Sequence, residues 1–406
     1  MNKTVVIGGG AAGLFAAYSS ALKGNKVILI EKNEKLGKKI YITGKGRCNL
    51  SNFVDINEFL NNVVSNSKFL YSALNRLSPS DTYSFFENLG LKLKIERGNR
   101  VFPLSDKASD VTKTLERGIK SLGAEVRLNE KVKDILTKDG KVTGIISDSG
   151  TEACDSVIVC TGGLSYPSTG SDGDGYVFAK NLGHTVTKLS PSLVGLELYG
   201  NEFLDMQGLS LKNVAIKVLS KDKVIYEDFG EMLFTHYGVS GPIILSASCI
   251  LSKTDINGIK LHIDLKPALD SKKLDEKLQR EFKERNISDV FNAMRSTLPK
   301  SLIQTVLNRA SVKTKLRCCD LKRQDRENLV NTIKDLEFSI KGLRGYNEAI
   351  VTSGGINVKE INSKTMESKI IKGLFFAGEV LDVDCFTGGF NLQSAFSTGY
   401  TAGENS

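Results

Sequence analysis

The sequence lacks the residues that would build several common kinds of site. Its 406 residues include only three His, which are widely separated, so a His-based metal site is excluded. Seven Cys is an odd number and no two form a CxxC pair, so we expect neither a zinc site nor a disulfide framework, and reduced thiols in the cytoplasm fit best. No uninterrupted apolar run reaches the length of a transmembrane helix. The apolar N-terminus has clustered glycines and no A-x-A pattern, so a signal peptide is not expected. The sequence predicts a soluble, cytoplasmic protein with no membrane partner.

Length and composition predict an ordinary globular chain with more than one domain. A chain of 406 residues exceeds one core of typical size, and 40% apolar with 25% charged residues is usual for a folded protein. The net charge of +9 could attract anionic ligands or nucleic acid. The basic residues are scattered, however, and the densest group, 315–326, is interleaved with acids and is typical of a solvated helix face. We therefore expect no nucleic-acid partner.

Hydrophobic periodicity divides the chain into three parts. Residues 3–31 read strand, glycine turn, helix and strand, and helices are expected over 56–89, with a cap at Ser78, and over 107–122. A β-meander ending in "SVIVCTGG" is expected next. Strand-like alternation over 192–267 and charged helical periodicity over 268–344 follow. We predict a discontinuous α/β domain, residues 1–191 and 345–406, interrupted by a β domain at 192–267 and a helical domain at 268–344.

The strongest local signal is a glycine turn. Gly8, Gly10 and Gly13 form G-x-G-x-x-G between the strand "TVVI" and a helix, and Glu31 ends the next strand. The first glycine permits the tight turn, the second lets the backbone approach a diphosphate, and the third lets helix and strand pack closely. The helix N-terminus favours negative charge, and Glu31 can accept hydrogen bonds from ribose hydroxyls. An acid at this strand end argues against a 2′-phosphate, which leaves FAD or NAD.

The elements after this unit favour FAD. The chain makes a long polar loop, helices and a meander, and it closes late with "GLFFAGE" and a glycine-led helix. That order is similar to the glutathione-reductase-like class of FAD domains, in which an acid at the place of Glu379 binds the ribitol chain. Gly388 and Gly389 open the last helix, whose N-terminus would stabilise negative charge on a reduced flavin. In the loop 42–52, Arg47 can neutralise phosphate or reduced flavin, so this loop is interpreted as a cofactor cradle.

Longer motifs extend this to a family resemblance. The segments "GKKIYITGKGRCNLSN", "GEMLFTHYGVSGPIIL", "VTSGGINVKEINSKTMESK" and "GLFFAGEVLDVDCFTGGFNLQSAFSTGYTAG" resemble the BaiN/RdsA-type flavoproteins, also described as YhiN-like or aminoacetone-oxidase-like. The resemblance spans essentially the whole chain. It implies an FAD domain with an inserted β-barrel-like domain and a small helical domain, non-covalent FAD, and NAD(P)- and FAD-dependent oxidoreductase activity. The expected cofactor contacts are Gly8, Gly10, Ala11, Ala12, Gly13, Glu31, Lys32, Lys39, Thr43, Gly46, Arg47, Cys48, Asn49, Thr161, Gly162, Gly163, Gly378, Glu379, Gly388, Gly389, Phe390, Asn391 and Leu392.

Other candidate residues carry weaker signals. His236, in "LFTHYGVSGP", could act as an acid or base towards substrate, or could be a structural His; Tyr237 beside it is equally ambiguous. Cys385 stands where the family pattern has Gly, and together with Cys48 it could be redox-active, although packed, unreactive thiols are the favoured interpretation.

Three functions follow from this reading. The first is an FAD-dependent reductase of an organic acceptor such as a steroid-like enone, with NADH or NADPH docking transiently over the flavin. The second is an oxidase of a small amine that produces hydrogen peroxide. The third, suggested only by the charge, is a flavin-bearing binding or RNA-associated protein.

Overall fold

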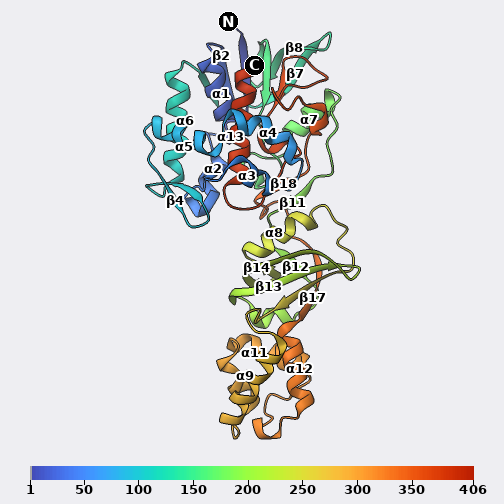
Figure 1. Ribbon diagram of the computed structural model, residues 1–406. Coiled ribbons are helices and arrows are strands. Elements are labelled where there is room, and N and C mark those ends of the chain that lie inside the picture. Colours follow the sequence, from blue (N-terminus) through green and yellow to red (C-terminus); the bar gives the residue numbers. More distant parts are fainter. Residues whose placement is uncertain (1) are drawn as a thin grey trace. The chain divides into compact units, whose positions relative to one another are not determined.

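The computed structural model describes residues 2–406 and shows two compact units (Figure 1). The first unit runs through Ser192 and resumes at Gly345–Ser406, and the second unit is Leu193–Arg344. Among residues 2–406, no helix combines the length and the apolar character needed to cross a membrane. The predicted cytoplasmic location stays a prediction.

A five-stranded parallel sheet forms the centre of the first unit, in the order β19-β10-β1-β2-β6. Short apolar runs such as "VVI", "VILI" and "LFF" build it, and such runs are typical of strands that are covered on both faces. Because all five strands are parallel, their carboxyl ends lie along one edge. The strands are β1 Lys3–Ile7, β2 Lys26–Glu31, β6 Glu125–Leu128, β10 Ser156–Val159 and β19 Leu374–Phe376.

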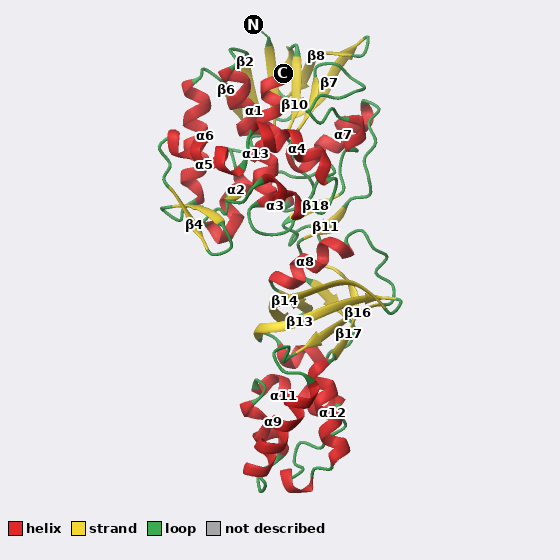
Figure 2. Ribbon diagram, viewed as in Figure 1, coloured by secondary structure: helices red, strands yellow, loops and turns green. Residues whose placement is uncertain are grey.

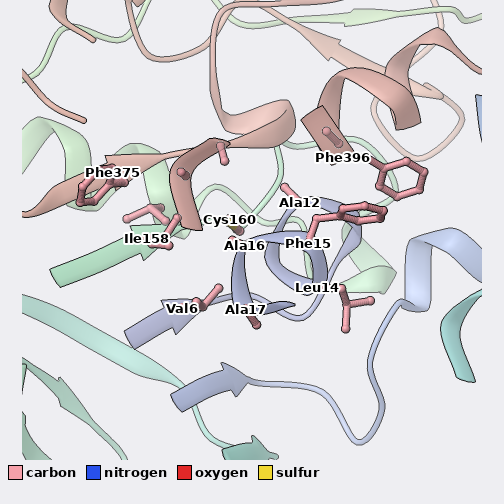
Figure 3. Close-up of a cluster of buried hydrophobic side chains, with 14 of the residues drawn as sticks. Val6, Ala12, Leu14, Phe15, Ala16, Ala17, Ile158, Cys160, Phe375 and Phe396 are labelled. Carbon is pink, nitrogen blue, oxygen red and sulfur yellow. The ribbon is translucent and has the colours of Figure 1, made fainter. Parts of the chain in front are cut away.

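Two helices from opposite ends of the chain pack closely beside this sheet. They are α1 Ala11–Leu22 and α13 Phe390–Asn405. A Cβ at Gly399 would lie 2.2 Å from the Ala12 carbonyl oxygen, so the close approach requires glycine there. The ring centroids of Phe15 and Phe396 lie 4.5 Å apart in the buried cluster between the helices (Figure 3). The N-terminal turn and the C-terminal helix therefore share one core.

The helices expected over 56–89 and 107–122 are confirmed (Figure 2). The cap at Ser78 is confirmed as well. The Ser78 hydroxyl accepts from the Asp81 N–H, and the Asp81 carboxylate accepts from the Ser78 N–H, which forms a capping box. The remaining helices of this unit are α2 Lys38–Ile42, α3 Ile56–Asn61, α4 Ser67–Arg76, α5 Pro79–Asn88, α6 Ala108–Ser121 and α7 Asp174–Asn181.

The predicted meander is only partly right. The strands β7, β8 and β9 form an antiparallel sheet, but β10 leaves it and pairs in parallel with β1 and β19. Its fully buried residues "SVIV" suit a central parallel strand, which hairpin spacing alone cannot reveal. The small sheets consist of β3 Ser51–Asn52, β4 Leu93–Glu96 and β5 Arg100–Pro103; β7 Val132–Lys138, β8 Lys141–Ser147 and β9 Gly150–Ala153; and β11 Ser190–Ser192 with β18 Val351–Ser353.

The second unit contains a closed antiparallel barrel, β12-β15-β14-β13-β16-β17, and a group of helices. The barrel strand β17, Leu336–Leu343, lies in the range expected to be helical, because a run of charged helical residues precedes it directly. Leu336, Phe338 and Ile340 alternate into the barrel core, and β17 closes the barrel between β12 and β16. The other elements are β12 Leu196–Leu198, β13 Ser210–Ser220, β14 Lys223–Thr235, β15 Gly238–Ser240, α8 Pro242–Leu251, β16 Ile259–Asp264, α9 Ser271–Glu284, α10 Val290–Ala293, α11 Lys300–Arg309 and α12 Arg323–Lys334.

Candidate functional site

The carboxyl edge of the parallel sheet gathers residues from four separate parts of the chain. Gly8 follows β1, Glu31 ends β2, Thr161 follows β10, and Gly378 follows β19. Neighbouring strands are hydrogen-bonded in register up to these points. The structure thus brings the predicted cofactor contacts that follow these strands to one edge of the sheet, which is where ligands bind in open parallel sheets.

The three glycines of the first turn have different surroundings. Gly8 has φ +100°, and a Cβ there would lie 2.6 Å from the Cys160 carbonyl oxygen; a Cβ at Gly13 would lie 1.8 Å from the Gly8 carbonyl oxygen. Both glycines are therefore required by the fold itself. A Cβ at Gly10 would meet no atom within 4 Å, and its φ of −82° suits any residue. The open space at Gly10, beside the N-terminus of α1 where Ala11 and Ala12 begin the helix, is suited to an anionic group.

Glu31 is buried and held in place by three hydrogen bonds. Its Oε2 accepts from the Gly9 N–H at 2.7 Å, and its Oε1 accepts from the backbone N–H and the side-chain amide of Asn33 at 2.9 and 2.6 Å. An ionised carboxylate offers about four acceptor positions, so one more donor can bind. Lys32, the next residue, pairs with Asp172 at 2.6 Å and Asp174 at 2.8 Å. Burial opposes its charge, but the two carboxylates outweigh burial and raise the pKa of Lys32.

A second charged group joins residues 340 positions apart in the sequence. Lys39 Nζ donates to Glu379 Oε2 at 2.8 Å and to the Ser165 hydroxyl at 2.8 Å. Glu379 Oε1 accepts from the Ser165 hydroxyl at 2.5 Å and from the Thr352 N–H at 2.9 Å. Burial alone would raise the pKa of Glu379, but Lys39 and these donors outweigh burial and lower it. Glu379 is therefore a fixed anion at the sheet edge.

Thr352 and Ser165 also belong to this group, although no sequence motif predicted them. The Thr352 hydroxyl accepts from the N–H groups of Leu164 and Ser165 at 2.8 and 3.1 Å, and a Cβ at Gly163 would lie 2.4 Å from that hydroxyl oxygen. Gly162 has φ +73°, and a Cβ there would meet the Ser171 hydroxyl at 2.8 Å. The sequence did carry a signal, because "VTSGG" repeats the strand-and-glycine pattern of "IVCTGG".

The loop after β2 has an unusual backbone. Gly44, Lys45, Gly46 and Cys48 all have positive φ, at +56°, +57°, +86° and +61°. Positive φ costs non-glycine residues free energy, so the surrounding structure must hold Lys45 and Cys48 in place. Part of that support comes from Thr43, whose carbonyl oxygen accepts from the Cys48 N–H at 3.1 Å. The interpretation of this loop as a cofactor cradle stays a prediction.

Arg47 ties this loop to neighbouring segments through ion pairs. Its guanidinium donates to Asp106 and Glu96 at distances between 2.5 and 3.3 Å and lies 4.2 Å above the Phe102 ring. Hydrogen bonds to both carboxylates raise the pKa of Arg47. Its charge is already compensated within the protein. A contact from Arg47 to phosphate or flavin stays a prediction.

The far end of the loop meets the start of α13. A Cβ at Gly389 would lie 2.3 Å from the Ser51 carbonyl oxygen and 3.0 Å from Asn49 Oδ1. The Asn52 amide donates to the Gly388 carbonyl oxygen at 3.0 Å. The Asn391 side chain points to Cys385 instead: its Oδ1 accepts from the Cys385 N–H, and its Nδ2 donates to the Cys385 carbonyl oxygen. The structure therefore brings Asn49 to Gly389, whereas Asn391 orders the loop before α13; Phe390 packs on Phe59, and Leu392 is half-buried.

Two predicted contacts carry unsatisfied polar atoms. Within residues 2–406, Asn49 Oδ1 and Thr161 Oγ1 are buried and have no hydrogen-bond partner. Leaving such an atom unpaired costs about 1–3 kcal/mol, so each would gain from a ligand that supplies a partner. Together with the open space at Gly10, the spare acceptor of Glu31 and the helix N-terminus, these atoms fit FAD.

Cys48 and His236 have contrasting environments. Cys48 is fully buried, and burial raises the pKa of its thiol to about 12, which favours the unreactive interpretation. His236 belongs to the second unit, exposed in the turn between β14 and β15, with its ring 4.9 Å from the Tyr237 ring. Arg344 lies 4.5 Å above Tyr237 and pairs with Glu197 at 2.9 Å. A catalytic role for His236 stays a prediction.

Known proteins resemble this chain over its whole length. Residues 2–405 match the family described as HI0933-like protein Rossmann domain. The 3-dehydro-bile acid delta(4,6)-reductase of Clostridium scindens is 31% identical over 99% of this chain and 98% of its own. The ribosomal RNA dihydrouridine synthase of Haemophilus influenzae is 31% identical over 98% of this chain and 97% of its own.

Solved structures agree on the fold. The 3-ketosteroid-delta4-(5alpha)-dehydrogenase of Rhodococcus jostii superposes with a TM-score of 0.54 at 14% identity, covering 100% of this chain and 96% of its own. A flavocytochrome c3 fumarate reductase gives 0.53 at 18% identity, covering 100% and 78%. At such low identity, these matches show the fold alone. The predicted α/β class, with a Rossmann-type FAD-binding fold and a β-barrel, is confirmed.

Proposed function

The chain belongs to the HI0933-like family, as its motifs predicted, and from that membership and the site we propose that it is an FAD-dependent reductase of carbon–carbon double bonds conjugated with a carbonyl group. The general prediction of an oxidoreductase is confirmed, since a relative that aligns over nearly its whole length is named a reductase. The reaction would add a hydride and a proton across the double bond, and NADH or NADPH would supply the hydride.

The chemistry shared by the relatives supports this reaction class. A 3-dehydro bile acid with delta(4,6) unsaturation is a conjugated ketone, and the double bond of the uridine ring that becomes saturated in dihydrouridine is conjugated with the ring carbonyl. In either compound, conjugate reduction would place a hydride at the carbon remote from the carbonyl and a proton at the adjacent carbon. A steroid-like enone is the substrate class we propose for this chain.

The observation that carries the proposal is the sheet edge with its open glycine and unpaired acceptors. Gly10 would let the backbone approach the diphosphate of FAD, and Glu31 would accept from its ribose. The N-terminus of α13 would favour negative charge on the isoalloxazine, with Asn49 Oδ1 accepting from it. When bound, FAD supplies hydride transfer in both directions. Lys39 and Glu379 would lie beside the ribitol chain of FAD and bind it.

The comparisons bear on the predicted absence of a nucleic-acid partner and leave the alternative oxidase function untested. The prediction of no nucleic-acid partner is not confirmed, because relatives from two organisms are named for ribosomal RNA. Oxidation of a small amine stays a prediction without further support.

Product analysis tests the proposed reaction. The FAD-loaded protein would be incubated without oxygen with NADH or NADPH and a 4-en-3-one steroid, beside the matching saturated 3-ketone as control. We expect a product heavier by two hydrogen atoms from the enone alone. An unchanged enone, together with hydrogen peroxide formed from aminoacetone in air, would contradict the proposal and favour the oxidase.

A further inference from the structure

The positive charge of the chain is concentrated in one part of the second unit. Residues 268–344 carry 18 Lys and Arg against 11 Asp and Glu, so +7 of the net charge of +9 lies there. Several of these basic side chains are ion-paired, among them Arg326 with Asp275, Lys334 with Asp264 and Arg309 with Glu202. The excess positive charge is therefore carried by the basic side chains that have no ion pair.

Ten of the 18 basic residues have no ion pair in the part of the chain that the structure describes, and five of the ten lie where two loops meet. We call Lys283, Arg285, Lys315, Arg317 and Lys322 the basic tip. All five are exposed, and within residues 2–406 none has a carboxylate at ion-pairing distance. They flank the end of α9 and the start of α12, the ends of those helices that do not lead into barrel strands (Figure 1).

Backbone hydrogen bonds hold the two loops together. The Val290 N–H donates to the Leu316 carbonyl oxygen at 2.9 Å, the Cys318 N–H to Ser288 at 3.0 Å, and the Cys319 N–H to Asn286 at 3.0 Å. Asp289 and Arg317 face each other in an isolated antiparallel bridge. The basic tip is therefore built on a defined backbone rather than on independent loops, which places Arg285 and Arg317 on neighbouring segments.

Exposure alternates along the second loop. Lys315 and Arg317 are exposed, whereas Leu316 is half-buried and Cys318 is buried. This corrects the interpretation of 315–326 as a helix face, since α12 begins only at Arg323. The basic side chains of the loop are thus exposed to solvent, while Leu316 and Cys318 are packed against the protein.

Charge at the tip is unbalanced. Glu284 and Asp320 lie among the five basic residues, and the carboxylate of Asp289 caps α10 by accepting from Asn292 at 2.7 Å. Unpaired like charges repel one another and destabilise a fold unless a partner neutralises them. Ile287, 83% exposed between Arg285 and Asp289, is the one exposed large apolar side chain among the described residues 283–289 and 315–322, so these residues form no apolar stripe for a membrane surface.

From these observations we propose that the basic tip of the second unit binds RNA through its phosphates. The segments 283–289 and 315–322 contain no aromatic residue, which favours contacts to the RNA backbone rather than to bases, so the binding would depend on salt and little on sequence. The relatives named for ribosomal RNA favour RNA over an acidic protein. This proposal does not depend on the proposed reductase chemistry.

The test measures anisotropy of a fluorescein-labelled RNA hairpin with the full FAD-loaded chain over a range of salt concentrations. The tip variant is Arg285→Gln/Lys315→Gln/Arg317→Gln. Its matched control, Lys212→Gln/Lys217→Gln/Lys223→Gln, removes the same charge from exposed positions of the barrel hairpin. Losing three phosphate contacts lowers the salt slope by about 2 and weakens binding about 100-fold at roughly 0.1 M salt.

We expect the control to bind within about twofold of the parent protein. No RNA binding by the parent, equal losses in both variants, or tip-dependent binding to phosphatidylserine vesicles in place of RNA would each overturn the proposal. The visible flavin spectrum and its response to NADPH are recorded on the same samples. If the flavin fails to respond while the tip variant loses RNA, the reductase proposal fails and the RNA surface stands.

Discussion

Replacing Gly10 by Ala separates binding of the cofactor from stability of the fold. Gly10 is the N-cap of α1 with an ordinary φ, and a Cβ there would contact no protein atom within 4 Å. Alanine is a slightly poorer N-cap but lowers the entropy of the unfolded chain, so we expect the free energy of unfolding of the apoprotein to change by less than about 1 kcal/mol.

The same methyl group would occupy the space proposed for the diphosphate of FAD. Overpacking a close contact costs about 1–3 kcal/mol, which corresponds to roughly 5- to 150-fold weaker FAD binding. Urea denaturation measures the stability, and quenching of flavin fluorescence measures the affinity.

Two other glycines serve as controls. Gly13→Ala would place Cβ 1.8 Å from the Gly8 carbonyl oxygen, so we expect it to destabilise the fold itself. Gly342→Ala, in β17 of the second unit, meets no atom within 4 Å and should change neither quantity. If Gly10→Ala binds FAD as tightly as the parent protein, the diphosphate does not lie at this turn.

Three further predictions follow from the structure. Glu379→Gln should lower the free energy of unfolding by about 2 kcal/mol at neutral pH, because it leaves Lys39 without its carboxylate. Since the folded pKa of Glu379 lies below its ordinary value of 4.5, the carboxylate stabilises fully above that value, and the difference should shrink as pH falls below it; urea titrations that show a constant difference would refute this. Gly399→Ala should lower the melting temperature, since its Cβ would lie 2.2 Å from a carbonyl oxygen of α1, and an unchanged melting curve would disprove that contact. Iodoacetamide should label Cys319 in the native protein and all seven Cys after unfolding, and mass spectrometry that finds Cys48 labelled in the native state would contradict its burial.

Local chemistry explains what the sequence could predict. The turn from Gly8 to Gly13 was recognisable because strand, glycines and helix follow one another directly, and the capping box at Ser78 for the same reason. The position of Glu31 at the end of β2 followed from the same unit. These features depend on neighbours within a few residues.

Long-range contacts explain what it could not predict. The ion pair of Lys39 with Glu379 joins two ends of the chain, and the partners of Arg47 come from 49 and 59 residues further along. No periodicity reports such pairings. The same limit applies to β17, whose place in the barrel depends on β12 and β16 rather than on its own charged surroundings.

The central claim is that the sheet edge holds FAD for a nicotinamide-fed reduction. The most direct measurement is the visible spectrum of the purified protein incubated with FAD and desalted, followed without oxygen while NADH and then NADPH are added. The account predicts a yellow protein whose flavin band bleaches on addition of one of the two nicotinamides and returns when a conjugated enone is added. A protein that stays colourless after incubation with FAD would contradict the cofactor site, and a yellow protein that neither nicotinamide bleaches would contradict the proposed electron donor.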